Sequence, residues 1–326
     1  MAAALEETPV TYEDLVDIEQ AFDDAETDII RYQASRLSDL YALRHKTVSQ
    51  IPNFWPLVLE QAPPDIDQYI QPSDSAVLLS ALTNLDVTHF DIPNPDGDPR
   101  SVSIKFEFST NEYFEDKVLE KKFWYRRGRN GWSGLVSEPV KIQWKKDRDL
   151  TGGLLDMVCD AWAVSRTGPK TVELSPEQLI LKKKIDSTGM GGLSFFAWFG
   201  FIGRHVSADE SKKAVESERE RRKGRALMKD VRTIDATDEL EEEEDDVGMS
   251  LEIFPDGGDL AVSITEDLWP SAISYFTQAQ EQDALSDDDF ESDDDENADS
   301  DRAGGDSEED ASQANSSRPV KKLRTS

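Results

Sequence analysis

The sequence has very little cysteine and histidine, and this scarcity limits the chemistry that it can support. Of 326 residues, one is a cysteine, Cys159, and three are histidines that lie far apart: His45, His89 and His205. A single cysteine cannot form an intrachain disulfide, so a reducing compartment fits this chain. Clustered Cys and His ligands of the kind that hold zinc are missing as well. We therefore expect no metal site.

Catalytic signatures are also missing. The sequence contains no HExxH, no GxxxxGK[ST] and no GxSxG pattern, and Gly189–Gly192 lacks the spacing of a nucleotide fingerprint. The acidic segments lack the ligand spacing and central glycine of an EF-hand loop. We expect a protein that is not an enzyme and that uses no cofactor.

Long apolar runs are absent too. The longest run, around Phe195–Ile202, is too short to cross a bilayer. The N-terminus lacks the basic and apolar regions of a secretory signal. We expect neither a membrane segment nor a membrane partner.

What the sequence has in excess is negative charge. The formal net charge is −32. Residues 286–310 contribute −13, Glu239–Asp246 contributes −7, and the basic residues near the C-terminus contribute +4, which leaves −16 for the rest of the chain. The expected folded body is therefore acidic in its own right. Such a field repels nucleic acids and attracts polycations.

Residues 11–50 carry a heptad pattern of apolar side chains. Steps of three and four residues are typical of a coiled-coil seam, and neither glycine nor proline occurs between Leu15 and Ile51. At 1.5 Å per residue, the pattern predicts one helix of roughly 50–55 Å. An amphipathic helix that lies on its own domain is the alternative, but a helix of this length would overhang a small domain, which favours pairing with a second copy. The predicted dimerisation residues are Leu15, Ile18, Phe22, Ala25, Ile29, Tyr32, Leu37, Leu40 and Leu43.

The middle of the chain predicts an antiparallel meander covered by helices. Alternation is clearest in SVSIKFEF, where Val102, Ile104, Phe106 and Phe108 share one face. Because the apolar residues of the alternating pattern lie on one face of the predicted sheet, we expect the other face to be solvated. The predicted strands are 85–91, 101–108, 118–126 and 140–144, with 128–134 as a loop; the predicted helices are 75–85, 176–200 and 258–282, with a charged helical stretch at 207–230.

Five short stretches occur in a fixed order along the chain. They are IPNFW (51–55), NEYFEDKVL (111–119), KIQWK (141–145, continuing to Thr151), SFFAWF (194–199) and EDLWP (266–270). Together, behind a long heptad helix, they closely resemble the nucleosome assembly protein family of histone chaperones. The nearer likeness is to its SET/template-activating-factor branch and the fungal relatives of that branch. The resemblance covers about residues 11–282.

This resemblance implies an α+β fold and a domain organisation. A long helix (11–50) follows a flexible N-terminus (1–10) and pairs antiparallel with a second copy to form a homodimer. Residues 51–282 form an earmuff domain, with a four-stranded antiparallel sheet covered by helices. This chain is longer than the short SET-type pattern at about 153–192 and 203–257, which are predicted insertions. Residues 283–326 are predicted to be a disordered acidic tail.

The resemblance also implies a function, the binding of core histones (H3–H4, H2A–H2B or both) on an acidic concave surface. The alternatives are a regulatory subunit of a chromatin-modifying enzyme such as a histone acetyltransferase, a protein phosphatase inhibitor, or an acidic scaffold without histone preference. Sequence-specific nucleic acid binding is not expected. The candidate histone-binding residues of the body, for each of which a solvated role is the alternative, are Glu112, Glu115, Asp116, Asp147, Asp149, Thr151, Glu266 and Asp267.

The acidic tail supplies further candidate residues. Its candidate histone contacts are Asp287, Asp288, Asp289, Glu291, Asp293, Asp294, Asp295 and Glu296. Ser286, Ser292 and Ser307 each precede three acids, a context that predicts phosphorylation and about −1.5 to −2 more charge per site. Lys321, Lys322 and Arg324 form a basic cluster that reads as a nuclear localisation signal. We expect a nuclear protein, with shuttling to the cytoplasm as an alternative.

Overall fold

A computed structural model describes residues 10–167, 174–188, 192–227 and 250–291 of the chain. One compact unit spans Met1–Glu281 and a second begins at Gln282. The long helix, the sheet and the helices that cover it all belong to the first unit, which is the subject of this description. Within the described residues, no helix is long and apolar enough to cross a membrane.

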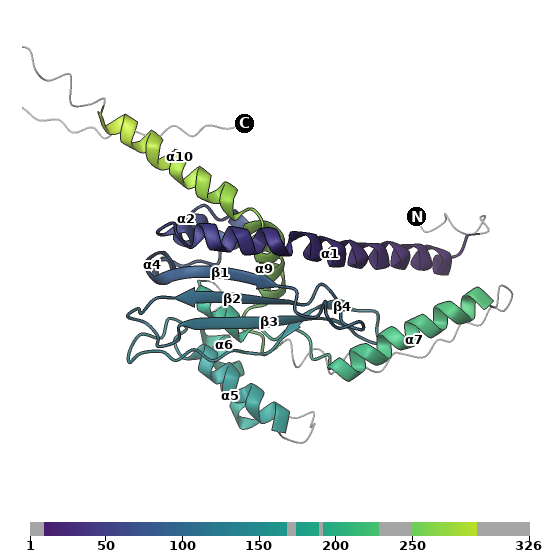
Figure 1. The fold of residues 1–326 in the computed structure, drawn as a ribbon. Helices are drawn as coiled ribbons and strands as arrows, with labels where there is room; N and C mark the ends of the chain where they lie inside the picture. Colours follow the sequence, from purple (N-terminus) through teal and green to yellow (C-terminus); the bar gives the residue numbers. More distant parts are fainter. Residues whose placement is uncertain (1–9, 168–173, 189–191, 228–249, 292–326) are drawn as a thin grey trace, which may run out of the picture. The chain divides into compact units, whose positions relative to one another are not determined.

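The predicted long helix is present as α1, Tyr12–Val48 (Figure 1). It begins with a capping box, in which the Thr11 side chain accepts a hydrogen bond from the Asp14 backbone and Asp14 accepts one in return. It ends shortly before Pro52, which could not continue a helix. Its 37 residues correspond to about 55 Å at 1.5 Å per residue. The predicted length is confirmed.

The sheet has four antiparallel strands in the order β1-β2-β3-β4, as the resemblance implied. They are β1 (Leu82–Thr88), β2 (Val102–Phe108), β3 (Val118–Arg127) and β4 (Ser133–Ser137). Val87 pairs with Ile104, which in turn pairs with Lys121, so these three residues share one face of the sheet.

The fourth strand was predicted in the wrong place. Ser133–Ser137, expected in part to be a loop, pairs with β3. The segment 140–144, expected to be a strand, does not join the sheet. The Val140 amide donates to the Phe199 carbonyl, and Trp144 forms an isolated bridge with Phe114. The apolar pattern of this segment therefore reflects packing against the core and not a place in the sheet.

The sequence did not predict the helices at 54–60, 64–67 and 154–167, and the predicted helix 258–282 is divided into α9, η2 and α10. The other helices differ from the predicted ranges mainly at their ends. The predicted helix 75–85 is α4, which begins earlier and ends at Ala81, where β1 follows. The range 176–200 contains two helices instead of one, and α10 continues past residue 282 to Glu291. Besides α1, the helices are α2 (Phe54–Glu60), α3 (Pro64–Asp67), α4 (Pro72–Ala81), α5 (Leu154–Thr167), α6 (Pro176–Thr188), the 3₁₀-helix η1 (Phe195–Gly200), α7 (Ala208–Leu227), α9 (Gly257–Ser263), the π-helix η2 (Ile264–Leu268) and α10 (Ala272–Glu291).

An aromatic cluster fills the space between the sheet and η1. Phe196, Trp198 and Phe199 are fully buried, and Trp198 stacks on Phe123 of β3 with ring centroids 5.2 Å apart. The Trp198 indole N–H donates to the Gly257 carbonyl, so its one polar atom is satisfied inside the core. The SFFAWF stretch is therefore part of the core.

Lys121 is a fully buried cation among these apolar side chains. Its Nζ donates to the carbonyl oxygens of Glu138, Phe199 and Phe201 at 2.9–3.0 Å. Burial lowers the pKa of Lys121 to about 7, against the opposing charge of Glu252. The carbonyls of Phe199 and Phe201 attach β3 to η1 and the residue that follows it, and the carbonyl of Glu138 attaches β3 to the segment after β4.

Lys121 gives the stability of the protein a pH dependence that can be measured. Between pH 7 and about 10, the unfolded lysine keeps a proton that the folded lysine has lost, so stability should rise with pH by up to about 1.4 kcal/mol per unit. Urea unfolding at pH 7, 8 and 9 should show this slope in the wild type. Lys121→Met should lose it; equal slopes in the two proteins would contradict the assignment.

Candidate functional site

The apolar face of α1 is exposed to solvent along most of its length. Phe22, Ile29 and Tyr32 are 68%, 61% and 69% exposed. Leu15, Ile18, Ala25, Leu40 and Leu43 are also exposed. Leu37 is half-buried, so of the nine predicted seam residues it alone is partly covered by its own domain. A continuous stripe of large exposed apolar side chains on a helix is typical of an interface with another chain.

The opposite face of α1 is fixed to the domain by arginine contacts. Asp23 forms ion pairs with Arg100, at 2.5 Å, and with Arg127. Burial alone would raise the pKa of Asp23, but the hydrogen bond and charge of Arg100, with the charge of Arg127, hold it below its ordinary value. Near the other end of α1, the Arg44 guanidinium donates to the Trp269 carbonyl at 2.5 Å. These contacts determine which face of α1 points outward.

Two loops that carry candidate acids lie side by side. The Glu115 amide donates to the Gln143 carbonyl at 2.9 Å, and the Lys145 amide donates to the Tyr113 carbonyl at 2.7 Å. With the Phe114–Trp144 bridge, these bonds join 111–117 to 141–149. The structure thus brings Glu112, Glu115, Asp116 and Asp147 onto one edge of the domain.

Cations occupy this edge together with the acids. Glu112 pairs with Arg148 at 3.6 Å, and Glu115 pairs with Lys145 at 3.7 Å. Asp116 accepts a hydrogen bond from the Gln143 amide at 2.6 Å. Exposed ion pairs of this kind contribute only about 0–1 kcal/mol each. Glu112 and Glu115 can therefore leave Arg148 and Lys145 and pair with the cations of a basic ligand at little cost in free energy.

Asp149 and Thr151 have local structural roles. Asp149 accepts hydrogen bonds from the Thr151 amide, the Thr151 hydroxyl and the Gly153 amide, each at 2.7 Å. Thr151 is 5% exposed, and its hydroxyl accepts from the Leu155 amide at 3.4 Å. Both residues stabilise the turn that leads into α5, which sequence reasoning did not foresee.

Glu266 and Asp267 lie in the π-helix η2, which precedes α10. Both are exposed. Asp267 accepts a hydrogen bond from the Tyr275 hydroxyl at 3.0 Å. Burial, and then this bond, raise the pKa of Tyr275. Asp267 is therefore partly occupied by a contact within the domain, whereas Glu266 projects into solvent.

Only some of the candidate residues of the tail lie within the part of the chain that the structure describes. Ser286, Asp287, Asp288, Asp289 and Glu291 belong to the last turns of α10. The other candidate acids of the tail, the two further serines and the basic cluster lie outside the described residues: Asp293, Asp294, Asp295, Glu296, Ser292, Ser307, Lys321, Lys322 and Arg324.

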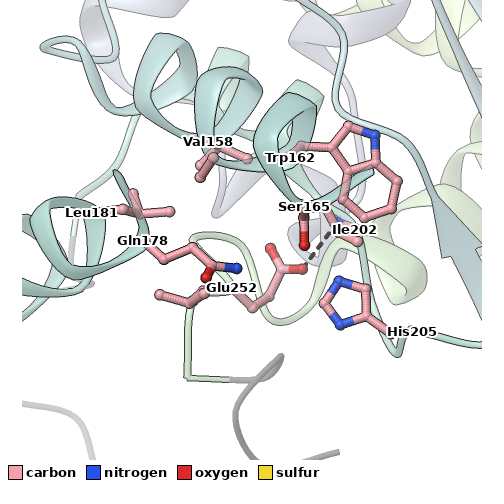
Figure 2. Close-up of a pocket in the computed structure, with 10 residues that line it drawn as sticks. Val158, Trp162, Ser165, Gln178, Leu181, Ile202, His205 and Glu252 are labelled. Atoms are coloured by element: carbon pink, nitrogen blue, oxygen red, sulfur yellow. Dashed lines mark hydrogen bonds between the residues drawn. The ribbon is translucent and has the colours of Figure 1, made fainter. Parts of the chain in front are cut away.

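Sequence reasoning did not identify Glu252, a buried acid beside a small cavity between α5 and α6 (Figure 2). Its carboxylate accepts hydrogen bonds from the amides of Ile202, Gly203 and Phe254 at 2.9 Å. Burial raises its pKa despite these donors. The cavity volume, about 20 Å³, suits about one water molecule and no larger ligand. Glu252 is therefore structural: it joins the segment that follows η1 to the segment that precedes α9.

The described residues offer no metal centre. No three of their His, Cys, Asp and Glu side chains are grouped so that they could hold an ion. Cys159 is partly buried, and burial raises its pKa to about 11, which disfavours the reactive thiolate.

These features define a protein with an α+β domain on a long helix whose apolar face is open to a partner. Comparison with known proteins then gives the family. The model of the nucleosome assembly protein (NAP) family matches residues 12–279. The chain belongs to the nucleosome assembly protein family.

Three relatives illustrate this membership. A Schizosaccharomyces pombe protein assigned to the nucleosome assembly proteins is 28% identical over 283 residues, which is 87% of this chain and 86% of the relative. Vacuolar protein sorting-associated protein 75 of Saccharomyces cerevisiae is 23% identical over 299 residues, 91% of this chain and 85% of the relative. The crystal structure of Vps75 matches with a TM-score of 0.51 at 22% identity, covering 82% of this chain and 98% of that one. Both curated relatives are fungal, in agreement with the expected branch.

The role of Asp149 can be tested by substitution. Asp149→Ala removes three hydrogen bonds at the start of α5 and should lower the free energy of unfolding by about 1–2 kcal/mol. Asp147→Asn is the control, because Asp147 is exposed and asparagine tolerates its positive φ of 60°. Urea unfolding should show a shift of less than about 0.5 kcal/mol for this control. Similar effects of the two substitutions would contradict the local role of Asp149.

Proposed function

We propose that this protein is a homodimeric histone chaperone that screens the charge of core histones away from DNA. The observation that carries the proposal is the match of the family model to a chain whose body stays acidic without its tail. A chaperone must cover the lysines and arginines of histones without competing with correct DNA binding. Many weak ion pairs on an acidic surface meet both requirements, because their total binding free energy is large but falls as the salt concentration rises.

The exposed stripe on α1 supports the homodimer. Phe22 and Ile29 lie near its middle, and the arginine contacts on the opposite face of α1 leave the stripe accessible. Pairing with the α1 helix of a second copy would bury these side chains at about 25 cal/mol per Å² of apolar surface. The pairing would also hold two acidic domains at a fixed separation, which suits a ligand with several basic surfaces.

The candidate histone contacts follow from exposure. Glu112, Glu115, Asp147 and Glu266 have exposed carboxylates, and the ion pairs of the first two are weak. The tail acids would add contacts once a histone has docked on the body, because attachment to the same chain gives them a high effective concentration. We propose the same surface for the binding of the core histone pair, whether H3–H4 or H2A–H2B, and of a histone acetyltransferase partner.

We also place this activity in the nucleus. Family membership supports a role on chromatin, and Lys321, Lys322 and Arg324 supply a short basic sequence suited to nuclear import.

Substitutions in the stripe test the dimer. The double variant Phe22→Asp, Ile29→Asp places charges where two helices would meet, and light scattering should give the mass of a monomer. Ser35→Asp is the control, because Ser35 is exposed on α1 but outside the stripe. It should remain a dimer. A dimeric mass for the double variant would contradict pairing through α1.

A plasmid supercoiling assay tests the proposed activity. Purified protein, core histones and a relaxed plasmid with topoisomerase should give supercoiled product at physiological salt, because histones released by a chaperone wrap DNA correctly. The protein should also keep histones soluble when DNA is added. If it neither deposits histones nor prevents their aggregation, the chaperone function is wrong.

A further inference from the structure

The structure contains a second, larger cavity between α2, α3 and α4, far from the loops described above in sequence. Its volume is about 140 Å³. This is similar to the engineered apolar cavity of about 150 Å³ that binds benzene. It can therefore accept the side chain of another molecule, which the 20 Å³ cavity near Glu252 cannot.

The walls of this cavity are apolar and rigid. Leu59 and Leu78 belong to the hydrophobic core and are 6% and 1% exposed. Ile70 packs against the same core, and Leu79, which is 40% exposed, lies at the surface end of the wall. Since these residues come from packed helices, the cavity is formed before any ligand binds.

The polar part of the lining consists of Ser75, whose hydroxyl donates to the Gln71 carbonyl, and two carboxylates. Glu60 is the last residue of α2 and Asp67 the last residue of α3, and both are exposed. Within the described part of the chain, neither side chain has an ion pair or hydrogen bond. Glu60 stands at the carboxyl end of α2, where the helix dipole favours cations over anions. Glu60 and Asp67 therefore add negative electrostatic potential at the cavity, where the described residues supply no counter-charge.

We propose that this cavity receives a lysine or arginine side chain of a basic polypeptide bound by the dimer. The aliphatic stem would lie against Leu59, Ile70, Leu78 and Leu79, and the cationic head would reach Glu60 and Asp67. Long basic side chains bind in this divided way, with the stem on apolar surface and the charge near solvent. The inference rests on the proposed function and assigns it an anchor point on the folded body.

Charge removal with a matched control tests the site. In the full chain, Glu60→Gln with Asp67→Asn removes both carboxylates while keeping the side-chain shapes. Asp65→Asn with Glu177→Gln removes the same charge from exposed positions that do not line the cavity. With purified H3–H4 at physiological salt, the first variant should bind about tenfold more weakly, whereas the second should change by less than about twofold.

Filling the cavity gives an independent test that leaves its charges in place. Leu79→Trp should occupy the space and produce a similar loss of H3–H4 affinity. Its melting temperature and dimer mass should match those of the wild type. If the protein with tryptophan is unfolded, Leu79→Phe provides the smaller filling side chain for the same measurement.

The outcomes separate this inference from the proposed function. If the wild type binds H3–H4 and either the charge variant or the folded filled variant binds equally well, the cavity is not an anchor. Failure of the wild type to bind histones would instead contradict the chaperone function. Hydrogen exchange supplies a third outcome: altered exchange at 59–79 on changing Lys321, Lys322 and Arg324 to alanine, without histones, would assign the cavity to the chain's own C-terminus and overturn the proposal.

Discussion

The ion pairs of Asp23 with Arg100 and Arg127 set the orientation on which the rest of the molecule depends. They attach one face of α1 to the loop before β2 and to the last residue of β3, while Arg44 attaches the same helix to the Trp269 carbonyl. A helix held at both ends cannot rotate to bury its apolar stripe in its own domain. The stripe must remain exposed or be covered by another chain, and this constraint is the basis of the proposed dimer.

The acidic residues of the body differ in whether they already have cationic partners. At the 111–117 and 141–149 edge, lysines and arginines pair with the acids at 3.6–3.7 Å. This edge is therefore a set of exchangeable ion pairs and not a uniformly negative surface. The cavity near Glu60 and Asp67 is different, since its carboxylates have no counter-charge among the described residues. Local pairing, more than net charge, distinguishes the surfaces that can hold a basic ligand.

Much of the fold could be predicted from the sequence because its signals are local. The heptad steps of α1 and the alternation of β2 are carried by neighbouring residues, and both elements appear as predicted. The fourth strand could not be placed, because the amides of Val140 and Lys145 donate to the carbonyls of Phe199 and Tyr113, which are distant in sequence.

Candidate sites were harder to predict than the fold, for the same reason. In LEKKFW, alternation places Lys121 on the inward face between Leu119 and Phe123, so a signal was present. The carbonyls that make its burial tolerable come from elements as far along the chain as Phe201. Likewise, nothing in the pattern around Asp149 shows that its carboxylate is occupied by the turn before α5, nor that Glu60 and Asp67 line the same cavity.

The central claim is that the folded acidic body, and not the tail alone, holds the histone. The most direct measurement is the affinity for core histones of a chain ending at Glu281, which lacks every candidate acid of the tail, over a series of salt concentrations beside the full chain. Our account predicts that the shortened chain stays dimeric and still binds, more weakly and with a shallower salt dependence because fewer charges take part. Loss of all binding at low salt would contradict it and assign the histone contact to the tail.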